Sequence, residues 1–358
     1  MTVAVDTTGI YVTQAGIARY VHGLVKGLKQ IAPPSLDWYP LAWEVENFGY
    51  RQPWRAMRTA YREAVWGKLV APRRMKARDT ELFHATSSLF VRVPRDVKQV
   101  ITLHDLSISR HPERFRPHQV RAWTNRIPRI RHADKIITIS KFTAEEAIRL
   151  LDLPGNRIEV VHNGCDFHPD EPAPKEAPPK DVTIPGEFFF FLGSLEPGKN
   201  LRLLREAYLS AEADRVNLPP LVIVGARWEG VAAEGQHPKN WTYLGRQPDE
   251  VVVYLYRRAL ALAFPAIYEG FGLPVIEAMS LNCPVICSPV SALPEVAGDA
   301  AMMVEQTPAA YRTAMVRLTS EPQTRDDLIR RGQARCRDFS WSGCARRVVD
   351  VYHAVLGR

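Results

Sequence analysis

The sequence predicts an α/β protein made of two domains, each with a doubly wound parallel sheet. The chain has 358 residues, which is more than one hydrophobic core usually serves. Short apolar segments alternate with helical ones, as in parallel sheets with crossover helices. A segment rich in proline and charge at 168–187 interrupts this alternation and cannot hold a helix. We therefore expect Rossmann-like domains at 1–167 and 188–338, a linker at 168–187 and a C-terminal helix in 339–358 that crosses back to the first domain.

The first domain contains several aliphatic runs short enough to be strands, and helical stretches follow two of them. Ser140 precedes one of these helices and is expected to cap it. Strands are expected at 3–8, 81–86, 98–106, 134–140 and 158–166, and helices at 16–32 and 141–153.

The same plan restarts after the linker with four consecutive phenylalanines. Strands are expected at 188–194, 220–226, 241–246, 260–266 and 284–289, and helices at 200–211, 248–259, 273–281 and 341–357. Open parallel sheets bind ligands at the carboxyl ends of their strands. Two such domains facing each other are expected to form a ligand cleft.

Cysteine usage and hydropathy indicate a cytoplasmic location. The five cysteines are odd in number and form no Cys-x-x-Cys pair, which favours free thiols in a reducing compartment over disulfides or a zinc site. No run of about 18 apolar residues occurs, so no membrane span is expected. The chain starts with a strand-like run and not with a charged segment before an apolar one, so no signal peptide is expected.

Positive charge is concentrated in the first half of the chain. The net charge is +8, and residues 1–166 carry 26 Lys/Arg against 16 Asp/Glu. Segment 51–78 has nine basic residues and one acid, Glu63, with arginines and aromatic residues at helical spacing. The arginines are Arg51, Arg55, Arg58 and Arg62, and the apolar residues between and just after them are Trp54, Tyr61, Val65 and Trp66. This pattern fits either a helix on an anionic membrane surface or a solvated basic face. No motif supports nucleic acid as a partner.

The segment AIYEGFGLPVIEAMS at 266–280 places two carboxylates, Glu269 and Glu277, around a glycine-bearing turn. The turn joins an expected strand to an expected helix, and Pro274 suits the first turn of that helix. The free N–H groups of that turn and the helix dipole favour an anion such as a diphosphate. Carboxylates repel phosphate and accept hydrogen bonds from hydroxyls. The combination indicates a nucleotide sugar; the alternative is an ordinary loop with two solvated glutamates.

A second loop, GSLEPGKN at 193–200, follows the first strand of the second domain. Gly193 ends that strand, and Lys199 offers a positive charge to phosphate. Because carboxyl ends of parallel strands share one edge of a sheet, this loop and the Glu269 loop are expected at the same edge.

These motifs resemble those of the retaining glycosyltransferases of the GT-B fold, family 4. The segment EGFGLPVIEAM resembles the family's E-x7-E signature, and CPVICSPVSALPEVAGDAA (283–301) resembles the strand and loop that follow it. GSLEPGKN resembles its phosphate loop. GIARY (16–20), ITLHDL, VVHNGCD and FSWSGCARRVVDVYHAVL resemble its glycine loop, His-Asp segment, Asn-Gly-x-Asp segment and last helix. The matches occur in family order over nearly the whole chain.

The resemblance implies a role for each matching residue. Glu269 would contact hydroxyls of the donor sugar, Glu277 the ribose, and Lys199 the diphosphate. His104 would border the reacting sugar and be oriented by Asp105. The remaining implied binding residues are Gly16, Ser194, Gly225, Arg246, Gly270, Phe271, Gly272 and Leu273.

Two positions depart from the usual pattern of the phosphate loop. Gly198 and Ser194 stand where many members carry basic residues. Either Lys199 and the helix dipole suffice for the leaving diphosphate, or an arginine such as Arg227 or Arg246 compensates.

The expected activity is transfer of a sugar from a nucleotide diphosphate to an acceptor hydroxyl with retention of configuration. No carboxylate pair is arranged for double displacement, so we expect a front-face route in which the leaving phosphate takes the acceptor proton. No Asp-x-Asp pair ends a strand, so neither a metal nor a cofactor beside the donor substrate is expected.

The Ser194-bearing phosphate loop resembles the mannosyltransferase-like branch that builds cell-surface polysaccharide or glycolipid. GDP-mannose is therefore the first choice of donor, with a UDP-sugar or another GDP-sugar as alternatives. Segment 51–78 would then dock the first domain on anionic lipid at the inner face of the plasma membrane and bring a lipid-linked acceptor to the cleft. A nucleotide-sugar epimerase and a catalytically silent nucleotide-sugar binder remain alternative functions.

Overall fold

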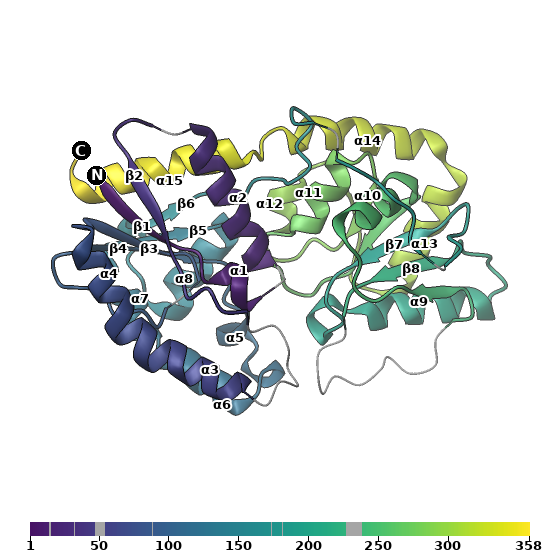
Figure 1. Ribbon diagram of the computed structural model, residues 1–358. Helices are drawn as coiled ribbons and strands as arrows, with labels where there is room; N and C mark the ends of the chain where they lie inside the picture. The colour runs from purple at the N-terminus through teal and green to yellow at the C-terminus, as the bar shows by residue number, and fades with distance from the viewer. Residues whose placement is uncertain are drawn as a thin grey trace. The chain divides into compact units, whose positions relative to one another are not determined.

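The computed structural model describes residues 1–13, 16–31, 33–46, 54–87, 89–172, 174–180, 182–226 and 238–358. Met1–Asp166 together with Ser340–Arg358 form one compact unit, called unit 1, and Phe167–Phe339 form the other, called unit 2. Each unit contains a six-stranded sheet in which neighbouring strands run parallel. The predicted α/β class with two doubly wound sheets is therefore confirmed (Figure 1).

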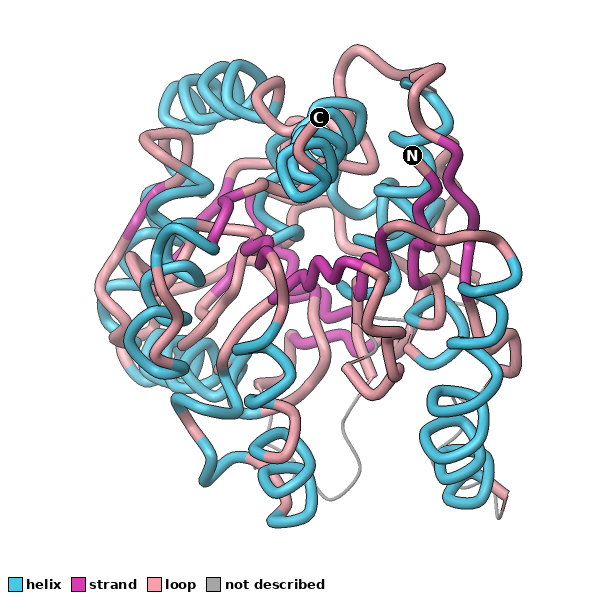
Figure 2. Tube along the Cα trace, turned by 90° about the vertical axis from the view of Figure 1, so that its left-hand side faces the viewer, coloured by secondary structure: helices cyan, strands magenta, loops and turns pink. Residues whose placement is uncertain are grey.

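The sheet of unit 1 has the strand order β2-β1-β3-β4-β5-β6. Its strands are β1 (Thr2–Asp6), β2 (Asp37–Leu41), β3 (Leu82–Ala85), β4 (Lys98–Leu103), β5 (Lys135–Thr138) and β6 (Ile158–Val160). The α-helices of the unit are α1 (Gly9–Val12), α2 (Gly16–Ile31), α3 (Arg55–Tyr61), α4 (Ala71–Ala77), α5 (Ser107–Arg110), α6 (Pro117–Thr124), α7 (Ile127–His132), α8 (Lys141–Leu151) and α15 (Trp341–Leu356). Seen from the side of this unit, the strands run between helices (Figure 2).

The sheet of unit 2 has the order β12-β11-β10-β7-β8-β9, the arrangement of dinucleotide-binding domains. Its strands are β7 (Phe189–Leu192), β8 (Leu221–Val224), β9 (Trp241–Tyr243), β10 (Ala261–Phe264), β11 (Val285–Cys287) and β12 (Met302–Met303). Its helices are α9 (Leu201–Ala213), α10 (Asp249–Arg258), α11 (Leu273–Ser280), α12 (Leu293–Ala297), α13 (Pro308–Ser320) and α14 (Pro322–Cys336). The phenylalanine run of β7 is fully buried, as expected for a central strand with both faces covered.

Strand β2 was not predicted from the sequence, because Pro40 lies within it. A proline cannot donate to a ladder and is tolerated only on edge strands. Strand β2 is such an edge, pairing with β1 alone.

The basic segment forms one helical rod over 55–77, with a π-helical stretch, η1 (Arg62–Val70), between α3 and α4 (Figure 1). Arg51 lies outside the described residues. Trp54 and Tyr61 are exposed, as a surface helix requires. Trp66 and Arg62 instead face inward: Trp66 is 5% exposed and belongs to the core, and the Arg62 side chain is 13% exposed. These two residues therefore do not belong to the predicted surface face.

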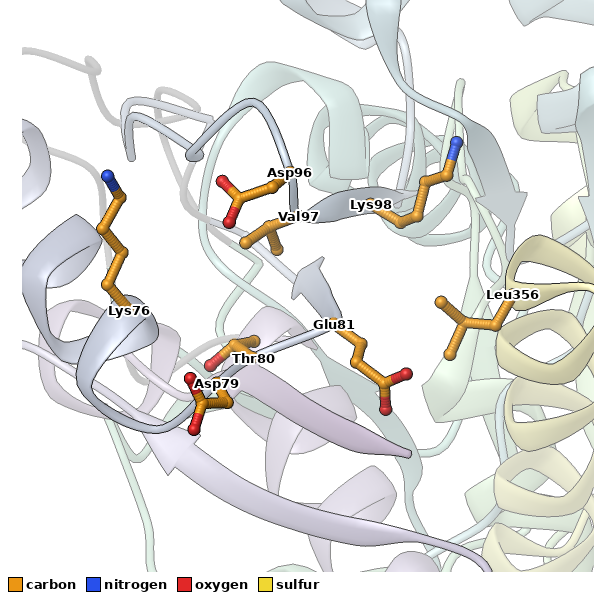
Figure 3. A pocket seen from close by; sticks show the side chains of 8 residues that line it. All are labelled: Lys76, Asp79, Thr80, Glu81, Asp96, Val97, Lys98 and Leu356. Carbon is orange, nitrogen blue, oxygen red and sulfur yellow. The ribbon is translucent and has the colours of Figure 1, made fainter.

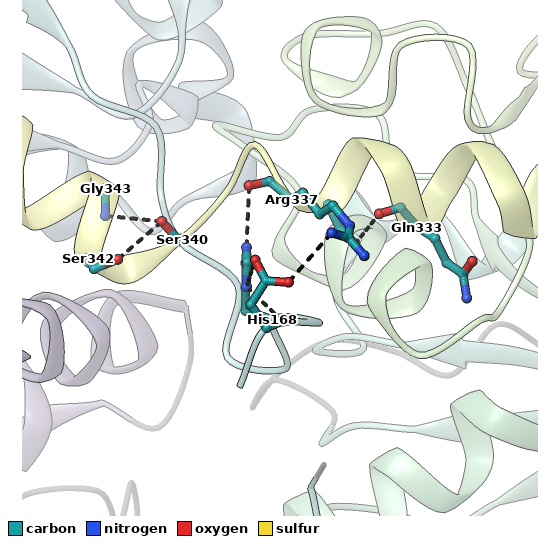
Figure 4. A network of polar contacts seen from close by, with 8 residues as sticks. His168, Gln333, Arg337, Ser340, Ser342 and Gly343 are labelled. Carbon is teal, nitrogen blue, oxygen red and sulfur yellow. Dashed lines mark hydrogen bonds and ion pairs between the residues drawn. The ribbon is translucent and has the colours of Figure 1, made fainter. Parts of the chain in front are cut away.

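The segment predicted as a linker contains no helix or strand among its described residues. The segment lies against helix α10, where the Ala177 amide donates to the Glu250 carbonyl at 3.1 Å. The Glu176 carboxylate pairs with Arg257 and Arg258 at 3.3 and 3.2 Å. At its start, the His168 ring makes a 3.3 Å hydrogen bond to the carbonyl of Arg337, within the same unit (Figure 4).

Helix α15 packs on helix α2 around one buried tryptophan, Trp341. A Cβ on Gly23 would lie 2.0 Å from the Trp341 ring, and one on Gly27 would lie 2.2 Å from the Trp341 carbonyl oxygen. The indole N–H donates to Asp166 at 2.7 Å, and the same carboxylate pairs with Arg19 at 2.9 Å. Gly23 and Gly27 on α2 thus leave space for Trp341, and a hydrogen bond to the Asp166 carboxylate fixes the indole ring.

Two smaller expectations are also borne out. Ser140 caps helix α8 by accepting from the Thr143 amide at 3.0 Å. All five cysteines are buried free thiols.

Within the described ranges, no helix has the length and hydropathy needed to cross a membrane.

Candidate functional site

In unit 2, candidate residues gather where the strand order of the sheet reverses direction. Strands β7 and β10 are neighbours, and the chain winds outward from them in opposite directions. Ligands of open α/β sheets bind at this switch point, outside the carboxyl ends of the strands. The loops that leave these two ends are 193–200 and 265–272. The Ile267 amide donates to the Gly198 carbonyl at 2.8 Å, so the two predicted loops do meet.

The loop after β7 is shaped by Glu196, which the sequence reasoning left without a role. Its carboxylate accepts from the Gly198 amide at 2.6 Å and thereby caps the 3-10 turn Pro197–Lys199. A Cβ on Gly198 would lie 2.7 Å from this carboxylate. A side chain at position 198 would therefore have to displace the Glu196 carboxylate that caps this turn.

Lys199 lies at the end of this turn and pairs with Glu269 from the neighbouring loop. The two side chains are 22% and 12% exposed, and the ammonium lies 5.6 Å from the centroid of the Phe264 ring. The structure thus brings together two of the three predicted catalytic residues. Glu269 is largely buried, so the alternative of two solvated glutamates is wrong.

The turn after β10 has the predicted backbone conformation. Gly272 has φ +101° and caps α11, with Pro274 in the first turn. A side chain at 272 would be strained there. The Val275 amide already donates to the Gly272 carbonyl at 2.9 Å. Two positions of this first turn therefore offer no free N–H to an anion: the Val275 amide is already bonded, and Pro274 has no N–H.

Glu277 is buried on α11, 2% exposed, and Tyr256 from α10 donates to it at 3.3 Å. The same hydroxyl lies 3.2 Å from the carbonyl of Pro274. Tyr256 therefore ties the start of α11 to its carboxylate. This role of Tyr256 was not predicted from the sequence, because a tyrosine inside an amphipathic helix indicates only a position in the core.

The loop after β8 passes close to the loop after β7. Gly225 has φ +152°, and a Cβ there would lie 1.7 Å from the Gly193 carbonyl oxygen. The backbone contact thus requires glycine at position 225. Arg246 is exposed, and Arg227 lies outside the described residues, so its compensating role remains a prediction.

In unit 1, His104 lies just beyond the carboxyl end of β4. Its Nε2 donates to the Thr86 carbonyl at 2.7 Å, and the Tyr20 ring meets it edge-on with centroids 4.8 Å apart. Burial lowers the pKa of His104, outweighing the opposite effects of Thr86 and Asp105. Because a carbonyl only accepts, Nε2 carries the proton, and Nδ1 of the neutral ring can accept a hydrogen bond.

Asp105, predicted to orient His104, acts on that ring through its charge and makes its hydrogen bonds to another residue. Its carboxylate accepts from the Ser107 amide at 2.9 Å and from the Ser107 hydroxyl at 2.7 Å, which turns the chain into α5. The carbonyl of Thr86 accepts the hydrogen bond from His104. A backbone acceptor from another strand carries no sequence signal.

The loop after β3 that carries Thr86 is held by Asp6, a fully buried carboxylate at the end of β1. Asp6 accepts from the Thr8 amide at 3.0 Å and from the Ser87 amide at 3.2 Å. Strands β1 and β3 are the switch point of this sheet. Gly16 is exposed at the start of α2, which follows β1 along the chain.

A pocket of about 620 Å³ lies at the opposite, amino-terminal edge of the sheet of unit 1 (Figure 3). Its lining includes both acids and lysines, and Lys98 is engaged with Asp134 at 2.9 Å. It contains none of the predicted site residues. Over the part of the chain that the structure describes, no three His, Cys, Asp or Glu side chains form a group able to hold a metal ion.

Comparison with known proteins agrees with this architecture. The family described as "Glycosyltransferase Family 4" matches residues 15–168, and that described as "Glycosyl transferases group 1" matches residues 175–335. The "O-antigen chain mannosyltransferase B" of Escherichia coli is 33% identical over 266 residues, 71% of this chain and 70% of the relative. The "Serotype-specific mannosyltransferase WbdA" of the same organism is 28% identical, and the match spans 75% of this chain but 35% of WbdA.

Among solved structures, sucrose-phosphate synthase from Thermosynechococcus elongatus is similar with a TM-score of 0.72 and 16% identity, covering 99% of each chain. At that identity the likeness shows the fold, which is GT-B. Fold and switch-point loops define a protein of the glycosyltransferase class. The chain belongs to the family 4 glycosyltransferases, as the family matches and the mannosyltransferase relative show.

Proposed function

We propose that this glycosyltransferase moves mannose from GDP-mannose to an acceptor hydroxyl with retention at the anomeric carbon. The observation that carries the proposal is the contact between Lys199 and Glu269 at the switch point of unit 2. A cation for the leaving diphosphate and an acceptor for sugar hydroxyls are thereby held side by side. Mannose as the sugar follows from the mannosyltransferase relatives.

Lys199 stabilises the charge that develops on the leaving phosphate, and that phosphate takes the proton of the acceptor hydroxyl. Glu269 holds the sugar through hydrogen bonds and is not a nucleophile, because its carboxylate is engaged with Lys199. Glu277, fixed by Tyr256, accepts from the ribose. Neutral His104 accepts a hydrogen bond from a sugar hydroxyl at Nδ1. The hydrogen bond from Nε2 to the Thr86 carbonyl keeps the proton on Nε2.

No metal takes part in the proposed reaction. The charge on the diphosphate is met by Lys199 and by the dipole of α11, whose first turn begins at Leu273. The reaction needs no cofactor beyond the donor.

The product is a cell-surface polysaccharide or glycolipid, as the name of the O-antigen relative suggests. The exposed Trp54 and Tyr61, together with the exposed Arg73 and Arg74, bind the protein to anionic lipid at the inner face of the plasma membrane. Vesicles with and without anionic lipid test this binding, which should weaken as salt rises. Salt-insensitive binding, or none, would remove the membrane contact from the proposal.

A panel of nucleotide sugars tests the activity. The protein should release GDP from GDP-mannose in the presence of acceptor and form a new glycoside that keeps the donor's anomeric configuration. Consumption of a UDP-sugar alone would show that the donor is a UDP-sugar and not GDP-mannose. An isomerised sugar would indicate an epimerase, and saturable binding without turnover would indicate a nucleotide-sugar-binding protein.

A further inference from the structure

The helical rod of unit 1 contributes to a second charged group that none of the assigned roles uses. It consists of the Glu63 carboxylate, the guanidinium groups of Arg62 and Arg126 that pair with it, and Arg129, which lies within electrostatic reach of Arg126. This group is called the arginine cluster. The Glu63 Oε1 atom lies 3.4 Å from Arg62 and 3.1 Å from Arg126. Arg129 donates to two neutral acceptors, the carbonyls of Leu89 and Val91, at 2.6 and 3.0 Å. Arg62 and Arg126 therefore share one carboxylate, and Arg129 is held by neutral groups.

Arg62 is the buried member of the arginine cluster. Its guanidinium lies 5.0 Å from the centroid of Phe90 and 6.0 Å from that of Trp43. Within the described part of the chain, its buried Nε has no hydrogen-bond partner. A buried donor left unpaired costs about 1–3 kcal/mol, so such a group usually has a water or a ligand as its partner. The π-helical stretch η1 begins at Arg62, and such stretches occur often at functional sites.

The arginine cluster lies at the carboxyl edge of the sheet of unit 1. Trp43 follows the end of β2, and Phe90 follows the end of β3. His104 follows the end of β4, at the same edge. Loops at this edge carry the ligand contacts of doubly wound sheets.

We propose that the arginine cluster binds a phosphate or diphosphate group carried by the acceptor substrate. A guanidinium group can donate two parallel hydrogen bonds to the oxygens of a phosphate, and the three guanidinium groups carry more positive charge than Glu63 offsets. The unpaired Nε of Arg62 supplies one donor, and Arg126, whose side chain is 33% exposed, supplies a second from the solvent side. This inference rests on the proposed function, since it names the chemical class of the acceptor.

Burial of the arginine cluster is consistent with such a site. Desolvation lowers the pKa of Arg62 and of Arg129, so both groups gain from a bound anion. The carboxylate of Asp6, also at this edge, favours the charged form of Arg62 as well, and it accepts hydrogen bonds from the Thr8 and Ser87 amides.

Calorimetric titration with inorganic pyrophosphate tests the proposal in the Lys199→Ala background, which removes the cation proposed for the donor. We expect Arg62→Gln to weaken pyrophosphate binding at least tenfold in that background. The matched control is Arg95→Gln, which removes an exposed arginine of unit 1 on the loop before β4, outside the rod, and should change the affinity less than twofold. Arg126→Gln is the second variant, because Arg62 also packs against aromatic rings and its replacement could disturb folding.

Unchanged affinity in both Arg62→Gln and Arg126→Gln, or no pyrophosphate binding before either change, would overturn the proposal. Vesicles containing phosphatidic acid distinguish the source of the phosphate. If Arg62→Gln weakens binding to these vesicles as well as to pyrophosphate, the phosphate is lipid-borne. If only pyrophosphate binding falls, the acceptor is a soluble phosphate ester. Sugar transfer in the donor panel is measured separately, so failure of the proposed function is distinguishable from failure of the arginine cluster.

Discussion

Lys199 pairs with Glu269, and the proposed mechanism adds a second role, assistance to the leaving phosphate, that substitution can separate from the first. The side chains are 22% and 12% exposed, so Lys199→Ala leaves a largely buried carboxylate without this cation. Breaking a fully buried pair costs about 3–5 kcal/mol, and breaking an exposed one costs at most about 1 kcal/mol. We expect an intermediate loss of about 1–3 kcal/mol in the free energy of unfolding, measured by urea denaturation.

Adding Glu269→Gln to Lys199→Ala should restore most of that stability, because the uncompensated charge is gone. Turnover should not recover. Loss of one electrostatic donor to the leaving group raises the barrier by about 2–4 kcal/mol, which is about 30- to 1,000-fold in kcat. The assay is release of nucleoside diphosphate from the donor identified in the panel.

Near-normal turnover in Lys199→Ala would refute the catalytic role of the lysine. Recovery of both turnover and stability in the double variant would show that Lys199 acts only by neutralising Glu269. Nucleoside diphosphate binding, measured by calorimetry on each folded variant, shows whether the lost cation acts in the ground state as well.

Three further predictions follow from burial and charge. Burial lowers the pKa of His84 to about 3 from 6.5, so its contribution to stability is complete above pH 6.5. Between that value and about pH 3, protonation of His84 should lower the free energy of unfolding by about 1.4 kcal/mol per pH unit, and His84→Gln should flatten this slope in denaturation curves. Gly23→Ala forces a Cβ to within 2.0 Å of Trp341 and should cost about 1–3 kcal/mol or more by thermal unfolding; the control Gly155→Ala, whose nearest contact is 3.7 Å away, should be near neutral. Activity should be unchanged in a chelator, and loss of turnover that Mg²⁺ restores would contradict the metal-independent mechanism.

Local pattern was sufficient wherever one segment carried its own signal. Apolar runs located most of the strands, Ser140 marked the start of α8, and the spacing of Gly272 and Pro274 located the turn before α11. Strand β2 was missed because Pro40 is compatible only with the edge position that pairing reveals. The inward face of the rod was missed at Arg62 and Trp66, because helical spacing alone does not say which side meets the core.

By itself the sequence determined the fold class, the resemblance to family 4 and the loops that carry the candidate site, since these depend on short-range pattern and on motif order. Only the tertiary structure decided which groups share a hydrogen bond. Lys199 meets Glu269, the carbonyl of Thr86 accepts from His104, and Tyr256 fixes Glu277. Each of these contacts joins residues that are distant in the sequence, and the packing of the strands and helices that carry their loops sets the distances between them.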